Sequence, residues 1–370
     1  MPHISHMQPP TQMKTVEVET NNLREEPMLA PSLFPEQAKV QWRMTGPKKR
    51  LLILGTSPLA VDLCRVILSQ NRWLVDIVGF LDEKTARVGG RLVNLGIIGT
   101  YNQLSQVIEQ HHVTTIVVCM EDRRSTLPVQ VLLDCKARGL DILDGHHLFE
   151  EASGRLSIDS LRPSALIFST GFRRRLTSLV SKRLLDVVVS AVGLVALFPL
   201  FILIAALIRV DSPGPVLYRQ VRVGLRGRPY MIWKFRSMRQ DAEKSGPRWA
   251  QANDPRISRV GWWLRKTRVD EIPQLLNVLK GDMSLVGPRP ERPVFVQGLR
   301  TTIPYYDIRH TVRPGVTGWA QVKFRYGASE EDSHTKLQYD LYYVKNLSLF
   351  LDLKILAHTI RVVMLGEGAH

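Results

Sequence analysis

The longest stretch without a charged side chain covers residues 187–208, which is 22 residues. A helix rises about 1.5 Å per residue, so this stretch could cross the apolar core of a bilayer. Pro199 interrupts it, and a proline inside a helix removes a backbone hydrogen bond and bends the helix. Asp186 directly precedes it. The stretch therefore predicts an apolar helix that bends at Pro199 rather than a straight span.

Basic residues flank this stretch on both sides. They are Arg173, Arg174, Arg175, Lys182 and Arg183 before it, and Arg209, Arg219 and Arg222 after it. Positive charge marks the cytoplasmic side of a membrane segment, so a single span should be asymmetric. The symmetric flanks predict a re-entrant membrane helix over residues 181–210 that enters and returns on one face. The alternative is a core helix of a soluble domain.

The net charge of +16 belongs to the second half of the chain. Residues 1–170 carry 18 basic and 18 acidic side chains, whereas residues 171–370 carry 32 and 16. A polyanionic partner of the second half could be nucleic acid, anionic lipid or a phosphorylated substrate. The three cysteines, Cys64, Cys119 and Cys135, have no CxxC spacing, which argues against a zinc cluster or a disulfide scaffold.

Residues 50–150 alternate short apolar runs with helical patterns, which predicts a parallel sheet with helices on its faces. The predicted strands are 51–55, 73–81, 114–120 and 140–143, and the predicted helices are 58–69, 101–111 and 127–138. The first strand–helix turn contains one glycine, Gly55, and so lacks a GxGxxG phosphate cradle. This Rossmann-like module either binds a nucleotide or serves packing or regulation.

The remaining regions complete an α/β chain. Residues 1–49 are rich in Pro, Glu, Gln and Thr and predict a flexible leader, and residues 151–180 predict a linker. Residues 211–370 predict a compact, mostly helical, loop-rich α/β catalytic domain around a polar site. Its tail, 346–365, predicts a basic amphipathic helix that either lies in a membrane interface or docks on the domain.

The chemistry concentrates around two adjacent carboxylates, Asp270 and Glu271, which follow Arg265, Lys266 and Arg268. Nearby cations favour ionised carboxylates. An ionised aspartate can attack phosphorus, and a neighbouring carboxylate can help to hold Mg²⁺ beside substrate phosphates. We expect catalysis and metal binding from this pair.

Candidate phosphate contacts lie on either side of this pair. Arg289 stands in a Gly-Pro-Arg-Pro sequence that should hold its guanidinium in a rigid turn. Lys234 and Arg236 alternate on one face of a predicted strand.

Together these strings resemble the bacterial sugar transferase family, the monotopic polyprenyl-phosphate phosphoglycosyl transferases, over about residues 180–366. The strings that carry the resemblance include Lys182-Arg183 with Asp186, Asp211-Ser212-Pro213-Gly214-Pro215, Gln220-Val221-Arg222-Val223-Gly224, Lys234-Phe235-Arg236-Ser237-Met238, Asp270-Glu271-Ile272-Pro273-Gln274, Gly287-Pro288-Arg289-Pro290, Arg313-Pro314-Gly315-Val316-Thr317-Gly318 and Tyr339-Asp340-Leu341-Tyr342-Tyr343. The module before them is similar to the one in long-chain members.

The resemblance implies transfer of a sugar-1-phosphate from a UDP-sugar to undecaprenyl phosphate, with release of UMP and a requirement for Mg²⁺. It implies that Asp270 is the nucleophile and that Glu271 assists the metal. Lys234, Arg265 and Arg289 match the family's active-site cations, and Arg325 and Asp340 are further matches that the resemblance implies contact the substrate phosphates.

The resemblance also implies a place in the cell and a pathway. We expect a monotopic protein on the cytoplasmic face of the bacterial inner membrane, in contact with lipid, without a nucleic-acid partner and with a possible homodimer. The reaction would start exopolysaccharide, capsule or O-antigen synthesis. Glucose and galactose are the default sugars, with N-acetylated sugars open.

One departure and two alternatives remain. Long-chain members usually carry four transmembrane helices before the module, and residues 1–170 contain no such run. The first alternative is a membrane-tethered nucleotide-sugar sensor without catalysis, which UMP release would exclude. The second is a basic nucleic-acid-binding protein, which dependence on detergent would exclude, and no known nucleic-acid module is visible.

Overall fold

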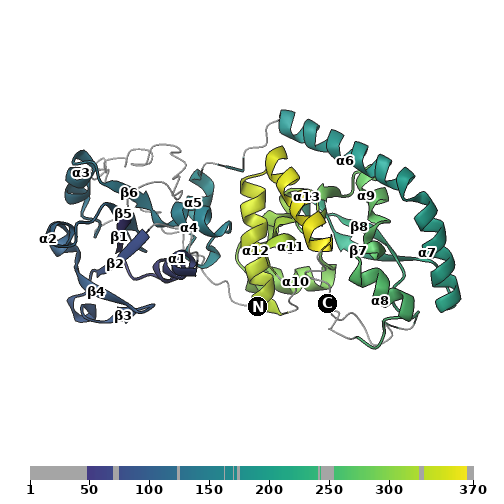
Figure 1. Ribbon diagram of the computed structural model, residues 1–370, viewed down its shortest axis with the longest axis horizontal. Coiled ribbons are helices and arrows are strands. Elements are labelled where there is room, and N and C mark those ends of the chain that lie inside the picture. Colours follow the sequence, from purple (N-terminus) through teal and green to yellow (C-terminus); the bar gives the residue numbers. More distant parts are fainter. Residues whose placement is uncertain are drawn as a thin grey trace, which may run out of the picture. The chain divides into compact units, whose positions relative to one another are not determined.

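The computed structural model describes residues 48–69, 75–122, 126–161, 163–169, 171–172, 176–240, 242, 254–324 and 329–364 (Figure 1). Over these residues the fold is mixed α/β. The predicted leader falls almost wholly outside the described residues, as do Arg173, Arg174, Arg175 and Arg325.

The Rossmann-like module contains one six-stranded sheet with the order β3-β4-β2-β1-β5-β6. Its strands are β1 (Lys49–Leu54), β2 (Val75–Asp82), β3 (Arg91–Leu92), β4 (Leu95–Thr100), β5 (Thr115–Val118) and β6 (Asp141–Asp144). All neighbours pair in parallel except β3 with β4. The predicted parallel sheet is therefore confirmed.

Helices cover both faces of this sheet, because alternate residues of its central strand point to opposite sides. Leu51 and Ile53 of β1 pack with α1 (Pro58–Ser69) and α4 (Gly145–Ser153), whereas Leu52 and Leu54 pack with α2 (Leu104–Gln110) and α3 (Val129–Ala137). The three predicted helices are confirmed with small shifts of their ends.

Sequence patterns missed the β3–β4 hairpin and α4. The hairpin turn contains Val93 and Asn94, both at positive φ (49° and 65°), as a two-residue type I′ turn requires. A β-branched valine is unusual there, so no turn signal marked it. Helix α4 starts at the Asp144 N-cap and occupies residues assigned in part to the linker, which also contains α5 (Pro163–Phe168).

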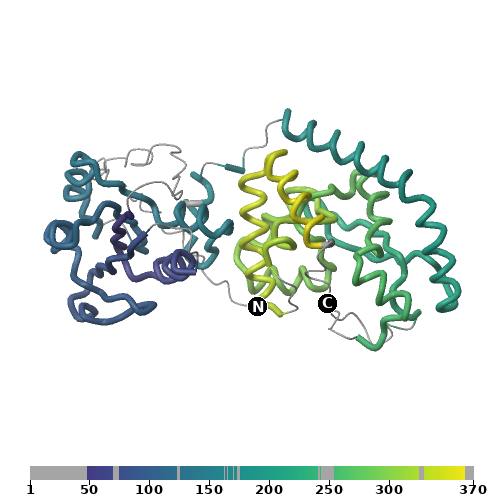
Figure 2. Tube along the Cα trace, viewed as in Figure 1, coloured from purple at the N-terminus to yellow at the C-terminus, as the bar shows by residue number. Residues whose placement is uncertain are grey.

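The apolar stretch forms two helices that meet at a bend, drawn in teal in Figure 2. They are α6 (Leu176–Ala196) and α7 (Phe198–Asp211), with Pro199 in the first turn of α7. Within the described residues, no single helix is both long and apolar enough to cross a membrane, but this pair, bent by 61°, passes the same criteria together. The predicted bend is confirmed, and the first helix begins five residues before residue 181.

The rest of the chain packs short strands among helices. Strands β7 (Leu217–Val223) and β8 (Pro229–Phe235) form an antiparallel hairpin, and β9 (Ser284–Val286) pairs in parallel with β10 (Gly315–Thr317). The helices are α8 (Arg259–Lys266), α9 (Gln274–Lys280), α10 (Pro293–Thr302), α11 (Trp319–Lys323), α12 (Glu330–Lys345) and α13 (Leu349–Met364).

Helix α13 confirms the predicted tail helix, but its apolar side chains do not lie on the single face that an amphipathic helix has. Leu351 and Ile355 are buried in the domain core. Phe350, Leu353 and Ile360 are exposed. The helix is therefore apolar on two sides: one side docks on the domain and the other is exposed.

Candidate active site

The Asp270-Glu271 pair sits on a single 3-10 turn between two helices. Helix α8 ends at Lys266, and Arg268 then adopts the left-handed conformation with φ 56°. A non-glycine residue in this conformation stores strain, which is common at functional sites. The turn that follows buries both carboxylates, with Asp270 7% and Glu271 8% exposed.

Glu271 is held by two cations on one oxygen. Lys234 Nζ lies 2.7 Å and Arg289 Nη2 lies 2.8 Å from its Oε1. Burial alone would raise the pKa of Glu271, but Arg289 and Lys234 outweigh burial and hold the pKa well below its usual range. Glu271 is therefore an ionised anchor that brings both cations to this point.

Asp270 is buried beside the same cations without a bonded partner. No hydrogen-bond donor or ion-pair partner meets its carboxylate within the described part of the chain. Burial raises its pKa, and although Lys234, Arg265 and Arg289 pull it down, burial and the neighbouring Glu271 prevail. Of the three cations that precede the pair in the sequence, Arg265 lowers the pKa of Asp270 as predicted, but burial and Glu271 outweigh it.

Lys234 reaches Glu271 because strand β8 is tied to helix α9. The buried Asn277 of α9 accepts a hydrogen bond from the Trp233 backbone N–H at 3.1 Å and donates to the Met231 carbonyl at 2.7 Å. These bonds fix Met231 and Trp233, and Trp233 directly precedes Lys234 in the strand. Sequence reasoning missed Asn277, whose only signal was an amide within the apolar sequence of α9.

Arg236 does not join the site. It follows the end of β8, and its guanidinium donates to the Ser212 carbonyl at 2.6 Å and the Pro213 carbonyl at 3.0 Å. It thereby fastens the end of α7 to the domain instead of facing the carboxylates. Arg265 does stay near: its Nε donates to Ser237 Oγ at 3.0 Å, and its charge lowers the pKa of Asp270.

Asp340, expected to contact substrate phosphates, lies on α12 and forms an ion pair with Arg309. It is 2% exposed, and its Oδ2 lies 2.9 Å from Arg309 Nη2. Burial raises its pKa to about 6 although Arg309 opposes this. Asp340 does not contact Asp270 or Glu271. Arg309 was not singled out from the sequence.

Three charged residues of α6, the first helix of the bent pair, bond to the rest of the domain. Lys182 Nζ lies 2.8 Å from Asp352 and 2.9 Å from the Val286 carbonyl. Arg183 donates to two carbonyls at the end of α9, and Asp186 accepts from the Leu285 N–H at 2.9 Å. The bent pair is thus bonded to the segments that carry the site.

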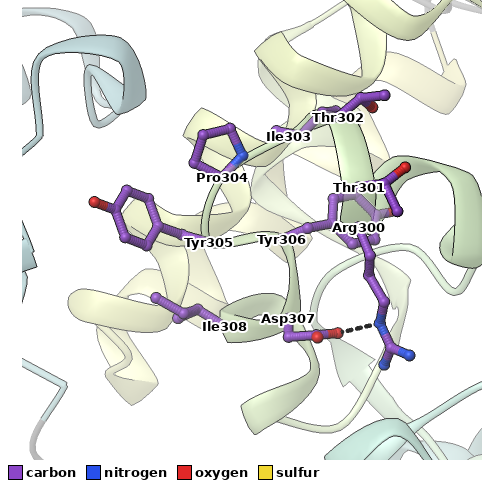
Figure 3. Close-up of a pocket in the computed structure, with 9 residues that line it drawn as sticks. All are labelled: Arg300, Thr301, Thr302, Ile303, Pro304, Tyr305, Tyr306, Asp307 and Ile308. Carbon is purple, nitrogen blue, oxygen red and sulfur yellow. Dashed lines mark hydrogen bonds and ion pairs between the residues drawn. The ribbon is translucent and has the colours of Figure 1, made fainter.

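A surface pocket lies elsewhere, in the segment from Arg300 to Ile308 (Figure 3). The Arg300–Asp307 ion pair, at 2.6 Å, lies beside it. None of the residues that line it belongs to the carboxylate site, so the pocket does not identify the active site.

Comparison with known proteins identifies the family. The family described as "Bacterial sugar transferase" matches residues 177–366. The chain belongs to the bacterial sugar transferase family. The match begins one residue into α6 and covers every element of the carboxylate site.

Curated bacterial sugar transferases and related proteins are similar over long stretches. A UDP-N-acetylgalactosamine-undecaprenyl-phosphate N-acetylgalactosaminephosphotransferase of Aeromonas hydrophila is 42% identical over 64% of this chain and 56% of its own length. An undecaprenyl-phosphate glucose phosphotransferase of Komagataeibacter xylinus is 33% identical over 87% of this chain and 60% of its own length. The chain thus spans somewhat over half the length of these two relatives.

The carboxylate pair of this bacterial sugar transferase is compatible with Mg²⁺. Within the described residues, no group of three or more Asp, Glu, His or Cys side chains could hold a metal by itself. Mg²⁺ typically takes one or two carboxylates and fills its shell with phosphate oxygens and water. The unbonded Asp270 carboxylate and Glu271, whose Oε1 serves the cations, are a donor set of this kind.

Proposed function

We propose that this protein transfers a sugar-1-phosphate from a UDP-sugar to undecaprenyl phosphate. The observation that carries the proposal is the buried, unbonded Asp270 carboxylate beside Lys234, Arg265, Arg289 and Glu271. A diphosphate brings negative charge that three cations can neutralise, and it offers an electrophilic phosphorus to an anionic oxygen.

In the first step, an oxygen of Asp270 attacks the β-phosphorus of the UDP-sugar. A bond forms between this oxygen and phosphorus, and the bond from the β-phosphorus to the bridging oxygen breaks. UMP leaves with that oxygen, and the sugar-phosphate stays on Asp270 as an acyl phosphate. Lys234 and Arg289, both held on Glu271, lie beside the developing charge.

In the second step, an oxygen of undecaprenyl phosphate attacks the same phosphorus. The bond from phosphorus to Asp270 breaks, the carboxylate is restored, and a lipid diphosphate sugar leaves. Mg²⁺ held by Asp270 and Glu271 together with phosphate oxygens would supply further charge neutralisation. The product would serve as the first lipid-linked unit of an exopolysaccharide, capsule or O-antigen.

We further propose that α6 and α7 form a re-entrant membrane helix. Val188, Val192 and Val195 of α6 and Phe198 and Ile202 of α7 are exposed apolar side chains along the bent pair. Lys182 and Arg183 fasten its beginning to the domain and Arg236 fastens its end, so both ends lie on one body. Together with the basic residues on both flanks, these contacts support our proposal that the domain lies on the cytoplasmic face of the bacterial inner membrane, in contact with lipid.

Cysteine labelling tests this topology. The native Cys64, Cys119 and Cys135 are buried, so single cysteines placed at Val180 and Ser212 should account for most of the labelling wherever the reagent reaches them. We expect both positions to resist a reagent that cannot cross the membrane and to react after permeabilisation. Labelling of one position from outside would refute the re-entrant arrangement.

An assay of UMP release tests the reaction. The purified protein in detergent, with Mg²⁺ and undecaprenyl phosphate, would be given UDP-glucose, UDP-galactose, UDP-N-acetylglucosamine or UDP-N-acetylgalactosamine. We expect UMP release and a lipid-linked product with at least one donor. Because relatives are named for both glucose and N-acetylgalactosamine, the panel includes plain and N-acetylated sugars. Failure with every donor would contradict the proposal and favour the sensor alternative.

A further inference from the structure

The turn that carries Arg289 has an unusually complete set of hydrogen bonds to its backbone. Four consecutive carbonyls, from Pro288 to Glu291, each accept a hydrogen bond. The donors, in order, are Gly315 N, Arg309 Nη2, Arg222 Nη1 and Val223 N, at 3.0, 2.8, 3.0 and 3.0 Å. Pro288 and Pro290 also restrict φ on either side of Arg289. The backbone of Arg289 therefore has almost no freedom.

Two of these four donors are side chains, and both are guanidinium groups. Most buried backbone carbonyls accept hydrogen bonds from the backbone or from water. Burying a charged side chain to donate to a carbonyl costs desolvation free energy, which other partners of that side chain must offset. Arg309 is 6% exposed and bonds the Arg289 carbonyl itself. Arg222 bonds the next carbonyl, that of Pro290.

Arg309 is in turn held from the other side. Its Nη2 also lies 2.9 Å from Asp340, and its Nη1 donates to the Tyr306 hydroxyl at 2.6 Å. The planar fork of an arginine can serve these partners together, whereas a lysine has one terminal nitrogen. A chain of contacts thus runs from Asp340 through Arg309 to the Arg289 backbone, and the Arg289 side chain ends on Glu271 at 2.8 Å.

We propose that Arg309, anchored by Asp340, is a positioning residue for the transfer reaction that fixes the Arg289 backbone and so sets where the Arg289 guanidinium meets Glu271 and the substrate diphosphate. The proposal rests on the proposed function for the reaction itself. It changes the role expected of Asp340: this residue acts through Arg309 rather than by touching substrate.

The test removes the buried pair while preserving the fold. Removing Arg309 alone would leave Asp340 buried and unpaired, so Arg309→Met is combined with Asp340→Leu. Replacing both members of a buried ion pair with apolar groups is often neutral for stability. The control is Arg300→Met with Asp307→Leu, which removes the more exposed ion pair that lines the pocket in Figure 3 without touching residues 287–291.

We expect the Arg309/Asp340 variant to melt within a few degrees of wild type and to lose about tenfold in kcat/KM, while the control pair keeps wild-type kinetics. The decisive comparison is a cycle with Arg289→Ala. If Arg309 acts through Arg289, removing the pair should cost less than about twofold once Arg289 is gone. An equal loss in both backgrounds, or wild-type kinetics for the pair variant, would overturn the proposal.

Hydrogen–deuterium exchange of the substrate-free protein gives a second readout that does not depend on activity. Peptides covering residues 286–296 should exchange faster in the Arg309/Asp340 variant than in wild type or in the control. Unchanged exchange there would overturn the proposal. If wild type releases no UMP with any donor, the proposed function fails, and the exchange result still decides whether Arg309 holds this turn.

Discussion

Asp82 in the Rossmann-like module and Asp270 in the transferase domain are equally hidden from solvent but differently bonded. Asp82 is 4% and Asp270 is 7% exposed. Asp82 accepts hydrogen bonds from the Thr56 hydroxyl, the Lys84 N–H and Arg87. Burial raises its pKa, but these bonds outweigh burial and lower the pKa overall, whereas the pKa of the unbonded Asp270 is raised. The two carboxylates thus differ in their hydrogen bonds, and Asp270 also has the neighbouring Glu271, which raises its pKa further.

Under the proposed function, Asp82 is a structural acid and Asp270 is the reactive one. In dinucleotide-binding Rossmann folds an acidic side chain near this position contacts the ribose. Here the Asp82 carboxylate accepts its hydrogen bonds from residues of its own module. Ser57 Oγ accepts from the Ala60 N–H in the first turn of α1. These contacts tie Asp82 and Ser57 into the structure of the module itself. In the proposed function, the unbonded Asp270 carboxylate is available to a substrate.

The largest effect should follow Asp270→Asn. The amide keeps the shape of the side chain but is a poor nucleophile, so we expect UMP release to fall by about a thousandfold or more. Asp82→Asn, purified and assayed in the same way, is the control and should turn over like wild type. Normal turnover by Asp270→Asn would contradict the proposed role of Asp270 as the nucleophile.

Glu271→Gln should be the next most severe change. Lys234 and Arg289 would lose the anion that brings them together, and a metal ligand would weaken, so we expect a loss of about a hundredfold. Raising Mg²⁺ should restore part of the activity of this variant and none of that of Asp270→Asn. Kinetics measured over a Mg²⁺ series check this, and equal rescue of both would contradict the division of roles.

Arg289→Lys should lose about tenfold in kcat/KM, equivalent to about 1.4 kcal/mol. A guanidinium can meet Glu271 and a phosphate in one plane, whereas an ammonium cannot. Steady-state kinetics with the preferred UDP-sugar are the measurement, and Arg300→Lys is the control. Wild-type kinetics for Arg289→Lys would remove this residue from the site.

The smallest effect on turnover should come from Asp82→Asn, which acts on stability. We expect a loss of about 2 kcal/mol, because hydrogen bonds to a charged acceptor are replaced by weaker ones. The folded-state pKa of Asp82 is lowered, so its contribution is present above the unfolded pKa near 4 and disappears as pH falls through the folded pKa. Thermal unfolding between pH 3 and 6 should show a smaller acid loss in the variant than in wild type.

Local patterns in the sequence predicted much of the fold. The boundaries of α1 are as predicted, and the parallel sheet and the bend at Pro199 follow from apolar periodicity and proline chemistry. The β3–β4 hairpin was missed because Val93 adopts a conformation that its residue type disfavours. The two apolar sides of α13 were missed because periodicity cannot tell a docked side from an exposed one.

The parts of the site that form a local cluster of charged residues could be predicted from the sequence. The parts that depend on contacts between residues far apart in the sequence could not. The clustering of Asp270 and Glu271 with Arg265 is visible in one short segment. The direction in which Arg236 points depends on the end of α7, 24 residues away. The grip of Arg309 on the Arg289 carbonyl joins residues 20 apart through a turn that no local pattern encodes.

Covalent trapping tests the central claim, that Asp270 is held unbonded for attack on phosphorus. Wild-type protein would react with UDP-sugar radiolabelled in the sugar, without lipid acceptor, and then be denatured and digested. We predict that UMP is released, that label stays on the protein, and that it maps to the peptide containing Asp270. Protein that turns over normally when lipid is supplied but never retains label would contradict the account and favour direct attack by the lipid phosphate.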